Sequence, residues 1–597
     1  MMRNKIDQKF SYNIINRGRA IFNYLPQLVG GSLFILMSYG CHQETEADKV
    51  YLNANIYTVD SSKPYASAMA VKADTILAIG NDQAVDSYIG PTTKVYDMKG
   101  QFIMPGFIEG HGHFQGLGKS LVELNLLKTR SWQQVEHLVD SVVSNTSAEW
   151  IVGRGWHQEK WDSLPQRHVE GYPHTSTMDI IAKDRPVMLK HASGHALFAN
   201  TAAMEKAGVI LESDGPDGGR IVRDETGQPI GIFEETAMQL IEDEYDRWYN
   251  DLSASERREI ELKEVEKAQL ECLRNGVTSF QDAGSNFQQI ELYRELSEND
   301  QLDLRLWVML RDSFEEMRPH MGELPYIKNS NKFFTCRAIK SEIDGALGSY
   351  GAWLLQPYND KPGYRGQNTT PLSEVEKIAQ LAKDNDMQLC VHAIGDRGNR
   401  VILDLMEQYI GPKGHQYRWR IEHAQHLHPN DIERFSNLGI IASMQAVHCT
   451  SDAPFVTKRL GFKRAKEGAY VWKSLLRSGA IVSNGTDAPV EDVDPLKNLY
   501  ASVSRRRTDD GMVFFKEQSI SREEAIHSMT MACAYAAYEE NEKGSLSPGK
   551  LADFIIVDTD LVGCQPADIL KANILATYVG GKLKYSHPSY KEQVNTL

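Results

Sequence analysis

The chain has 597 residues, more than a single small module needs, and its 41% hydrophobic content is enough for a large core. Its formal net charge is -15, which argues against a nucleic-acid partner because such a protein needs a basic surface. None of its seven cysteines forms a Cys-x-x-Cys pair, so no thiol-rich zinc site or redox motif is indicated. A small-molecule substrate is the partner we expect.

Residues 1–41 are typical of a bacterial export signal. A basic region precedes an apolar stretch from about Leu28 to Met37. This stretch is too short for an ordinary transmembrane helix, which needs about 20 apolar residues. It ends in Ser38-Tyr39-Gly40-Cys41, which resembles the lipobox of bacterial lipoproteins. We expect a lipid anchor at Cys41 that holds the protein to a membrane of the bacterial cell envelope. A plain signal peptide, giving a periplasmic protein, and an uncleaved anchor are the alternatives.

Both ends of the chain favour β structure. Residues 49–105 contain short β-type runs separated by turn residues, and a similar texture returns in residues 545–590. Two such segments predict one small composite β-sandwich that is built from the N- and C-terminal parts of the chain.

The middle of the chain, residues 106–544, alternates apolar strand candidates with helical segments. The first candidate precedes His111, and the others are residues 277–280, 304–310, 337–343, 388–392, 418–423, 440–444 and 480–483. Eight such units predict an α/β fold with a (β/α)8 TIM barrel. A ninth run, residues 186–190, exceeds the count, and we place it in an insertion at about residues 120–270.

Three helix starts are predicted from capping patterns and periodicity. Apolar residues recur at helical spacing between Ser253 and Asn275. Ser373-x-x-Glu376 and Ser521-x-x-Glu524 have the pattern of capping boxes.

His111-Gly112-His113 is the most informative motif of the chain. Two residues that are two positions apart on a strand point to the same face, so both imidazoles could hold one metal ion. An isolated pair is a weak signal, but other candidate ligands follow at or near the ends of later strand candidates: Lys340, His392, His423 and Asp487. Because the strands of a barrel end at one mouth, these side chains should converge there. Four imidazoles and a carboxylate suit Zn²⁺ or a similar ion.

Lys340 is the unusual member of this set, because a free ammonium group would be repelled by a metal ion. A lysine carboxylated by CO2 would instead be an anionic oxygen ligand and could bridge two ions. The alternative is an ordinary ion pair with Glu342 or Asp344. Lys190 is the rival lysine, but it lies on the surplus ninth run.

Several motifs together resemble the amidohydrolase superfamily, in the amidohydrolase-3 or YtcJ-like branch. They are residues 102–113, 339–348, 421–426, 443–445 with His448, 485–490 and 543–553. The resemblance runs from about residue 49 to residue 585. It implies a distorted barrel with a composite β-sandwich, and metal ligands in the order His111, His113, Lys340, His392, His423, Asp487. Thr486 departs from the serine that is commoner in the family, but it keeps the hydroxyl group.

The resemblance predicts a hydrolase that cleaves a C–N bond of a small amide, formamide or cyclic amide. One or two divalent ions, with Zn²⁺ expected, would activate water. Asp487 would be the catalytic residue that moves the water's proton to the leaving nitrogen. His195 resembles a family residue that faces the substrate, and His448, at the end of the seventh strand candidate, is expected to contact a substrate oxygen. For both histidines a structural role is the alternative.

Other functions stay open at this point. The same site could hydrolyse an ester or lactone or deaminate a base, since a fold does not decide the reaction. A catalytically inactive, lipid-anchored binding protein is a third hypothesis, from a different class. The sequence leaves open the substrate, the number of ions and the oligomeric state, a homodimer included.

Overall fold

The computed structural model describes residues 46–597 except 159–160, 193–194, 212, 217, 328–330, 412–413, 592–593 and 596–597. The predicted export signal and Cys41 lie outside the described residues. Within the described part, no helix combines the length and the apolar character that crossing a membrane requires.

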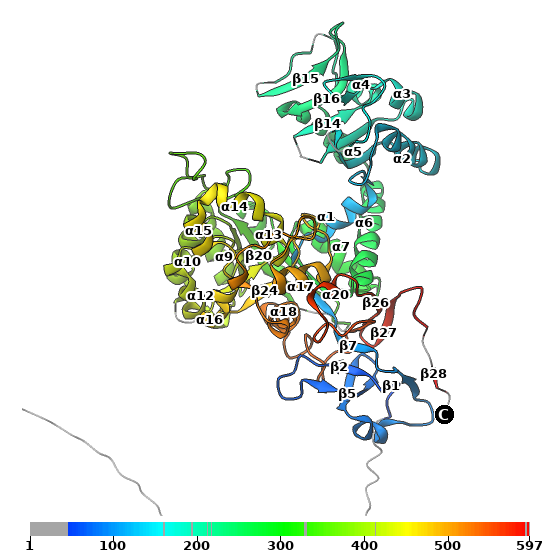
Figure 1. The fold of residues 1–597 in the computed structure, drawn as a ribbon, viewed down its shortest axis with the longest axis vertical. Helices are drawn as coiled ribbons and strands as arrows, with labels where there is room; N and C mark the ends of the chain where they lie inside the picture. Colours follow the sequence, from blue (N-terminus) through cyan, green and yellow to red (C-terminus); the bar gives the residue numbers. More distant parts are fainter. Residues whose placement is uncertain are drawn as a thin grey trace, which may run out of the picture. The chain divides into compact units, whose positions relative to one another are not determined.

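Eight parallel strands form the central barrel, and neighbouring strands pair in chain order. The barrel is drawn mostly in green to orange in Figure 1. Its strands are β8 (Phe107–Gly112), β17 (Val277–Ser285), β18 (Arg305–Leu310), β20 (Phe334–Glu342), β21 (Gln388–Ala393), β22 (Arg420–His423), β23 (Ile441–Met444) and β24 (Val482–Asn484). A short strand, β19 (Tyr326–Ile327), pairs antiparallel with β20. Each of the eight sequence candidates overlaps one of the eight parallel strands, so the predicted α/β barrel is confirmed.

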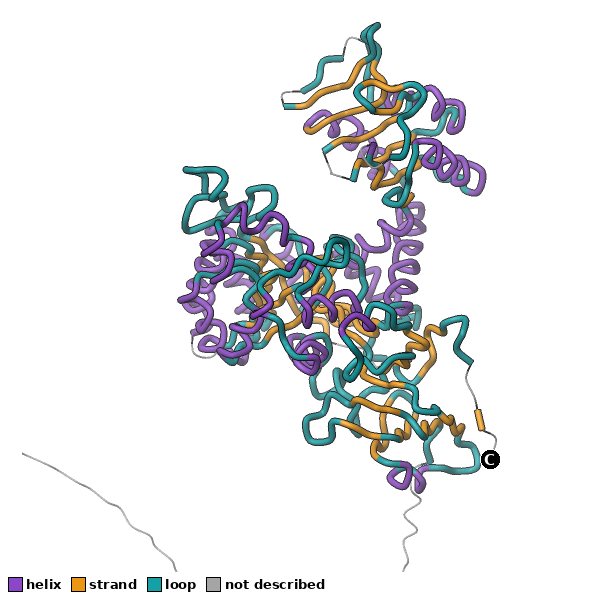
Figure 2. Tube along the Cα trace, in the orientation of Figure 1, coloured by secondary structure: helices purple, strands orange, loops and turns teal. Residues whose placement is uncertain are grey.

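The strands are buried because helices cover the outside of the barrel, as in other parallel sheets (Figure 2). All six residues of β18 are buried. Helices that follow the strands bury one apolar stripe each: α7 (Phe287–Glu298), α9 (Leu372–Asp384), α10 (Asp396–Ile410), α12 (Ile432–Leu438), α16 (Trp472–Ser478) and α17 (Pro495–Ser504). These apolar stripes pack the helices against the outside of the sheet. The carboxyl ends of the strands then lie together at one end of the barrel.

Two sheets outside the barrel combine the two ends of the described chain. One contains β1 (Lys49–Leu52), β4 (Ala68–Lys72), β5 (Thr75–Gly80), β6 (Lys94–Asp97) and β28 (Val594–Asn595). The other contains β2 (Asn55–Tyr57), β3 (Tyr65–Ala66), β7 (Phe102–Pro105), β25 (Phe554–Val557), β26 (Ile574–Val579) and β27 (Lys582–Ser586). The antiparallel pair β7–β25 joins residues that lie about 450 positions apart in the sequence. Between the sheets the rings of Phe554 and Tyr578 stack, and Tyr51 packs edge-on against Phe554.

A separate six-stranded sheet lies between β8 and β17 in the chain. Its strands are β9 (Leu124–Asn125), β10 (Ile151–Trp156), β13 (Val187–His191), β14 (Ala196–Ala199), β15 (Gly219–Arg223) and β16 (Pro229–Glu235). The surplus ninth run is therefore β13, which belongs to this sheet and not to the barrel. The chain leaves the barrel through α1 (Phe114–Val122) and returns through α6 (Ala254–Arg274). A Cβ on Gly118 would lie 2.1 Å from the carbonyl oxygen of Glu264, so glycine allows these two helices to touch.

The structure confirms some of the predicted helix starts and contradicts one. Ser253 and Ser521 each cap a helix through a complete capping box, at α6 and at α18 (Arg522–Ser528). The predicted box at Ser373 is wrong, because α9 already begins at Leu372, directly after Pro371. Pro371 occupies the N-cap position, so Ser373 lies inside the first turn of the helix, where it cannot be the cap.

Candidate metal centre

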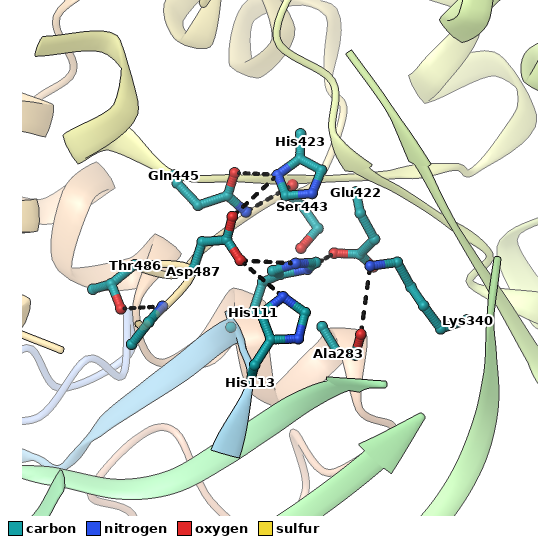
Figure 3. A network of polar contacts seen from close by, with 12 residues as sticks. His111, His113, Ala283, Lys340, Glu422, His423, Ser443, Gln445, Thr486 and Asp487 are labelled. Atoms are coloured by element: carbon teal, nitrogen blue, oxygen red, sulfur yellow. Dashed lines mark hydrogen bonds and ion pairs between the residues drawn. The ribbon is translucent and has the colours of Figure 1, made fainter. Parts of the chain in front are cut away.

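Two histidines from the end of β8 converge on one oxygen of Asp487 (Figure 3). His111 is buried within the strand, and its Nε2 lies 3.5 Å from Asp487 Oδ1. His113 is the residue before α1, and its Nε2 lies 3.2 Å from the same oxygen. The spacing of the motif therefore brings both rings to the same side of the strand end.

Two further histidines face the other oxygen of Asp487. His423, at the end of β22, places Nδ1 4.0 Å from Asp487 Oδ2, and His448 places Nε2 3.8 Å from it. Asp487 thus joins two candidate metal-binding groups, His111–His113–Asp487 and His423–His448–Asp487. His448 lies on α13 (Ala446–Ser451) and not at the end of β23 as the sequence suggested, because β23 ends at Met444.

His392 and Lys340 lie on the adjoining strands. The ring centroid of His392 is 4.4 Å from that of His423, and its Nε2 is 3.9 Å from Asp344 Oδ1. Lys340 is buried near the end of β20, and its Nζ is 3.5 Å from the carbonyl oxygen of Ala283. Burial lowers the pKa of this lysine below its ordinary value.

The alternative partners of Lys340 are engaged elsewhere. Glu342 accepts a hydrogen bond from Arg311 at 2.6 Å, and Asp344 accepts three from backbone N–H groups. The rival Lys190 lies on β13 of the insertion sheet, where its Nζ is 2.6 Å from Glu242.

His195 does not belong to the cluster around Asp487. Its side chain is 68% exposed, and its Nδ1 lies 3.1 Å from Glu235 Oε2 in the insertion sheet. Its predicted contact with a substrate stays a prediction.

The donor set fits a divalent cation. Four buried atoms of the centre have no hydrogen-bond partner among the residues that the structure describes: His111 Nε2, His392 Nε2, His448 Nε2 and Asp487 Oδ1. A buried polar atom without a partner costs about 1–3 kcal/mol. Three of these residues, His111, His448 and Asp487, belong to the two groups whose ligand atoms lie within 4.8 Å of one another, so a bound cation would satisfy atoms that otherwise have no partner.

Comparison with known proteins agrees with this centre. Residues 94–585 match the model of the amidohydrolase family. The chain belongs to the amidohydrolase family. This confirms the resemblance to amidohydrolases that was based on the sequence motifs.

Relatives of this amidohydrolase match almost the whole chain. The protein LONG AFTER FAR-RED 3 of Arabidopsis thaliana is 32% identical over 90% of this chain and 92% of its own length. The N-substituted formamide deformylase of Arthrobacter pascens is 25% identical over 90% of this chain and 98% of its own length. A crystal structure of an uncharacterized metal-dependent hydrolase from Pyrococcus furiosus, 27% identical, superimposes with a TM-score of 0.70 and covers 86% of this chain and 99% of that one.

The protonation states of the amidohydrolase centre suit metal binding. Burial lowers the pKa of His111 to about 4 and that of His392 to about 3, so both rings are neutral near pH 7. Burial alone would raise the pKa of Asp487, but the close approach of His113 and the other surrounding imidazoles outweigh it and hold that pKa well below its usual range. Neutral imidazoles and an ionised carboxylate are the forms that coordinate metals.

A buried ion pair orients His111 from behind. His111 Nδ1 is 2.5 Å from Glu422 Oε2, and Arg420 Nε is 2.7 Å from Glu422 Oε1. Burial would raise the pKa of Glu422, but Arg420 and His111 outweigh it and leave the pKa far below its ordinary value. The ionised carboxylate accepts the Nδ1 proton, which leaves the Nε2 lone pair directed at the centre.

The sequence analysis did not identify Arg420 and Glu422 as an ion pair, although both lie within a predicted strand. Arg420 and Glu422 are alternate residues of β22, so both point into the barrel beside His423's strand end. Gln445, whose Oε1 lies 2.9 Å from His423 Nδ1, was quoted in a family motif without a role.

Glu109 is a second buried carboxylate that supports the centre. It accepts hydrogen bonds from the Thr486 backbone N–H at 2.6 Å and from the Thr486 hydroxyl at 2.9 Å. Burial raises its pKa to about 8. The threonine that departs from the family pattern therefore uses its hydroxyl to tie β8 to the Asp487 loop.

Proposed function

We propose that this amidohydrolase hydrolyses a C–N bond of a small molecule, in an amide, formamide or cyclic amide. The observation that carries the proposal is the position of Asp487, whose two oxygens each face a pair of histidines. The family supports hydrolysis, and the name of the Arthrobacter pascens relative supports a formamide-type bond.

The residues that would hold the metal are His111, His113, Lys340, His392, His423 and Asp487, with Lys340 in its carboxylated form. His448 also faces Asp487, with Nε2 3.8 Å from Oδ2, but it is not one of these ligands and is assigned to the substrate below. One or two divalent ions, Zn²⁺ in the first place, would lower the pKa of water to about 7 and polarise the substrate carbonyl.

Asp487 would transfer the proton of the attacking water to the leaving nitrogen. Its depressed pKa keeps it ionised near neutral pH, so it can accept the proton of the attacking water. The same carboxyl group would then release that proton to the leaving nitrogen. His448 would hold the substrate oxygen through Nε2, because Gln425 Nε2 lies 3.1 Å from its Nδ1 and fixes the ring.

Metal content and turnover together test this proposal. We would measure ions per chain in wild type and in Lys340→Ala, using protein from residue 42 onward. About two ions in wild type and a sharp fall in the variant would support a lysine-bridged pair; about one unchanged ion would remove the bridging role. Hydrolysis is then screened on formamides, cyclic amides, esters and lactones. Bound metal without turnover on any of them would favour the binding-protein alternative.

Location in the cell envelope is a separate part of the proposal. We propose that Cys41 carries the lipid anchor, on the basis of the residues that precede it. Metabolic labelling with a fatty-acid analogue should mark wild type and not Cys41→Ser. Labelling of both proteins, or of neither, would contradict the anchor.

A further inference from the structure

A cavity of about 680 Å³ lies between α1 and the insertion sheet. Its lining includes Gly116, Lys119, Arg154, Lys190, Glu242 and Pro489. Arg154 and Pro489 also line a second cavity of about 460 Å³ beside it. The first volume falls within the range of about 300–1,000 Å³ that is usual for small-molecule sites.

This cavity adjoins the exposed side of the metal centre. Gly116 of the lining lies three residues after His113, and Pro489 of the lining lies two residues after Asp487, so the cavity borders the segments that carry these two candidate ligands. The His113 side chain is 31% exposed, whereas those of His111 and Asp487 are 0% and 8% exposed. The cavity therefore lies on the side of the centre where a candidate ligand is exposed.

Two cations stand side by side on the insertion sheet. Arg154 of β10 is directly opposite Lys190 in the parallel β10–β13 pair. Cross-strand neighbours share a face of the sheet, and like charges in that position repel each other. Lys190 is neutralised by Glu242 at 2.6 Å. Arg154 has no ion pair with any residue that the structure describes.

None of the other charged groups of the cavity forms an ion pair with Arg154 among the described residues. Lys119 lies over the ring of Tyr245, with Nζ 5.6 Å from the centroid. Glu123 also lines the cavity; burial raises the pKa of this carboxyl group, against the opposing attraction of Lys119, Lys190 and Arg154. The remaining carboxylates, Asp243 and Asp246, are exposed on α5 (Gln239–Asp251).

We infer that Arg154 binds a carboxylate group of the substrate, so that the preferred substrates are amides that carry a free carboxylate away from the scissile bond. N-acyl amino acids are the simplest members of this class. A guanidinium group binds a carboxylate through two parallel N–H···O bonds, which fixes both position and orientation. The inference rests on the proposed C–N hydrolysis for its reaction, but the binding step stands independently of it.

The test compares two formamides that differ only in the carboxylate. We would measure kcat/KM for N-formylphenylalanine and N-formylphenethylamine with wild type, Arg154→Gln and Arg154→Lys. The matched control is Arg167→Gln, which removes an exposed arginine of the insertion outside the cavity lining.

Wild type should prefer the carboxylate substrate at least about tenfold. Arg154→Gln should remove that preference and leave the neutral substrate within about twofold, and Arg154→Lys should fall between them. Equal losses on both substrates, or no loss, would overturn the inference.

A binding experiment separates this inference from the proposed reaction. If neither formamide is hydrolysed, the proposed function fails. The role of Arg154 can still be tested by measuring the binding of N-acetylphenylalanine and N-acetylphenethylamine by calorimetry. Tighter binding of the acid to wild type, lost in Arg154→Gln and retained in Arg167→Gln, would support the carboxylate site. Equal affinities for the two probes, or no binding of the acid, would refute it.

Discussion

The backbone N–H of Asp487 donates a hydrogen bond to the carbonyl oxygen of His111 at 2.8 Å. The next such bond runs from the His113 N–H to the carbonyl oxygen of Ala488 at 2.7 Å. These bonds join the loop after the last barrel strand to the first strand. The segments that carry His111, His113 and Asp487 are therefore hydrogen-bonded to each other where the first and last strands of the barrel meet. The positions of these side chains depend on that junction.

Replacement of Asp487 by asparagine should remove most turnover. The amide cannot accept the proton of the attacking water, and general acid–base catalysis of this kind contributes about 10²–10⁴-fold in rate. We expect kcat to fall within or beyond that range on whichever substrate the screen identifies. Circular dichroism should be unchanged, since asparagine has the same shape and keeps the backbone bond to His111. Near-normal turnover would show that Asp487 is not the proton carrier.

Glu422→Gln should weaken metal binding without touching the metal directly. The amide no longer attracts the Nδ1 proton of His111 as a carboxylate does, so the ring loses its fixed tautomer. Loss of such a supporting group lowers metal affinity by about 10–100-fold. Competition with a metal-sensitive dye would measure the affinity.

The stability of the same variant gives an independent readout. Arg420 would remain buried without its counter-ion, which costs about 3–5 kcal/mol in the free energy of unfolding. Glu315→Gln, at an exposed glutamate, is the matched control and should change neither quantity. Unchanged affinity in Glu422→Gln would mean that His111 is oriented by the backbone alone.

Thr486→Val should destabilise the loop that carries Asp487. Valine has the shape of threonine but cannot donate to Glu109, so a buried carboxyl group loses one of its bonds. The expected loss is about 1–3 kcal/mol in the free energy of unfolding. Thr486→Ser retains the donor and should lose less, which chemical denaturation would show. Equal losses in the two variants would assign the effect to packing and not to the hydrogen bond.

The sequence predicts the barrel well because its strands are buried on both faces and so read as continuous apolar runs. His111, His113 and Asp487 could be placed together because the ends of barrel strands meet at one mouth. The predicted capping box at Ser373 was wrong because the local pattern does not show that the helix begins one residue earlier, at Leu372. His448 was placed at a strand end because the boundary at Met444 depends on pairing with β22 and β24, which no local pattern reveals.

Glu109, Arg420 and Glu422 were missed for a different reason. A charged residue within an apolar run is ambiguous until its partner is known, and these partners come from distant parts of the chain. Glu109 and Thr486 are 377 positions apart, and His111 and Glu422 are 311 positions apart. Only the closed barrel brings them together. The cavity around Arg154 has the same origin, since α1 and two insertion strands form it jointly.

A buried ion pair between Arg305 of β18 and Asp553, beside β25, should make stability depend on acid pH. Arg305 Nε is 2.7 Å from Asp553 Oδ2, and both side chains are at most 5% exposed. Burial raises the pKa of Asp553, but the attraction of Arg305 outweighs it, so the net pKa lies below its ordinary value. A carboxyl group with a depressed folded pKa stabilises the fold above its unfolded value of about 3.9. That stabilisation is lost as the pH falls through the folded value.

Asp553→Asn should therefore cost about 3–5 kcal/mol in the free energy of unfolding at pH 7, because Arg305 stays buried without its counter-ion. The difference from wild type should begin to shrink below about pH 4, where the carboxyl group of the unfolded chain takes up a proton, and should keep shrinking until the pH reaches the lower folded pKa. Denaturant unfolding of both proteins at pH 7, 5, 4 and 3 would measure it. Asp568→Asn, which breaks an exposed ion pair with Lys571, is the control and should follow wild type at every pH. A difference between wild type and Asp553→Asn that stays constant down to pH 3 would show that the pair does not contribute through its charge.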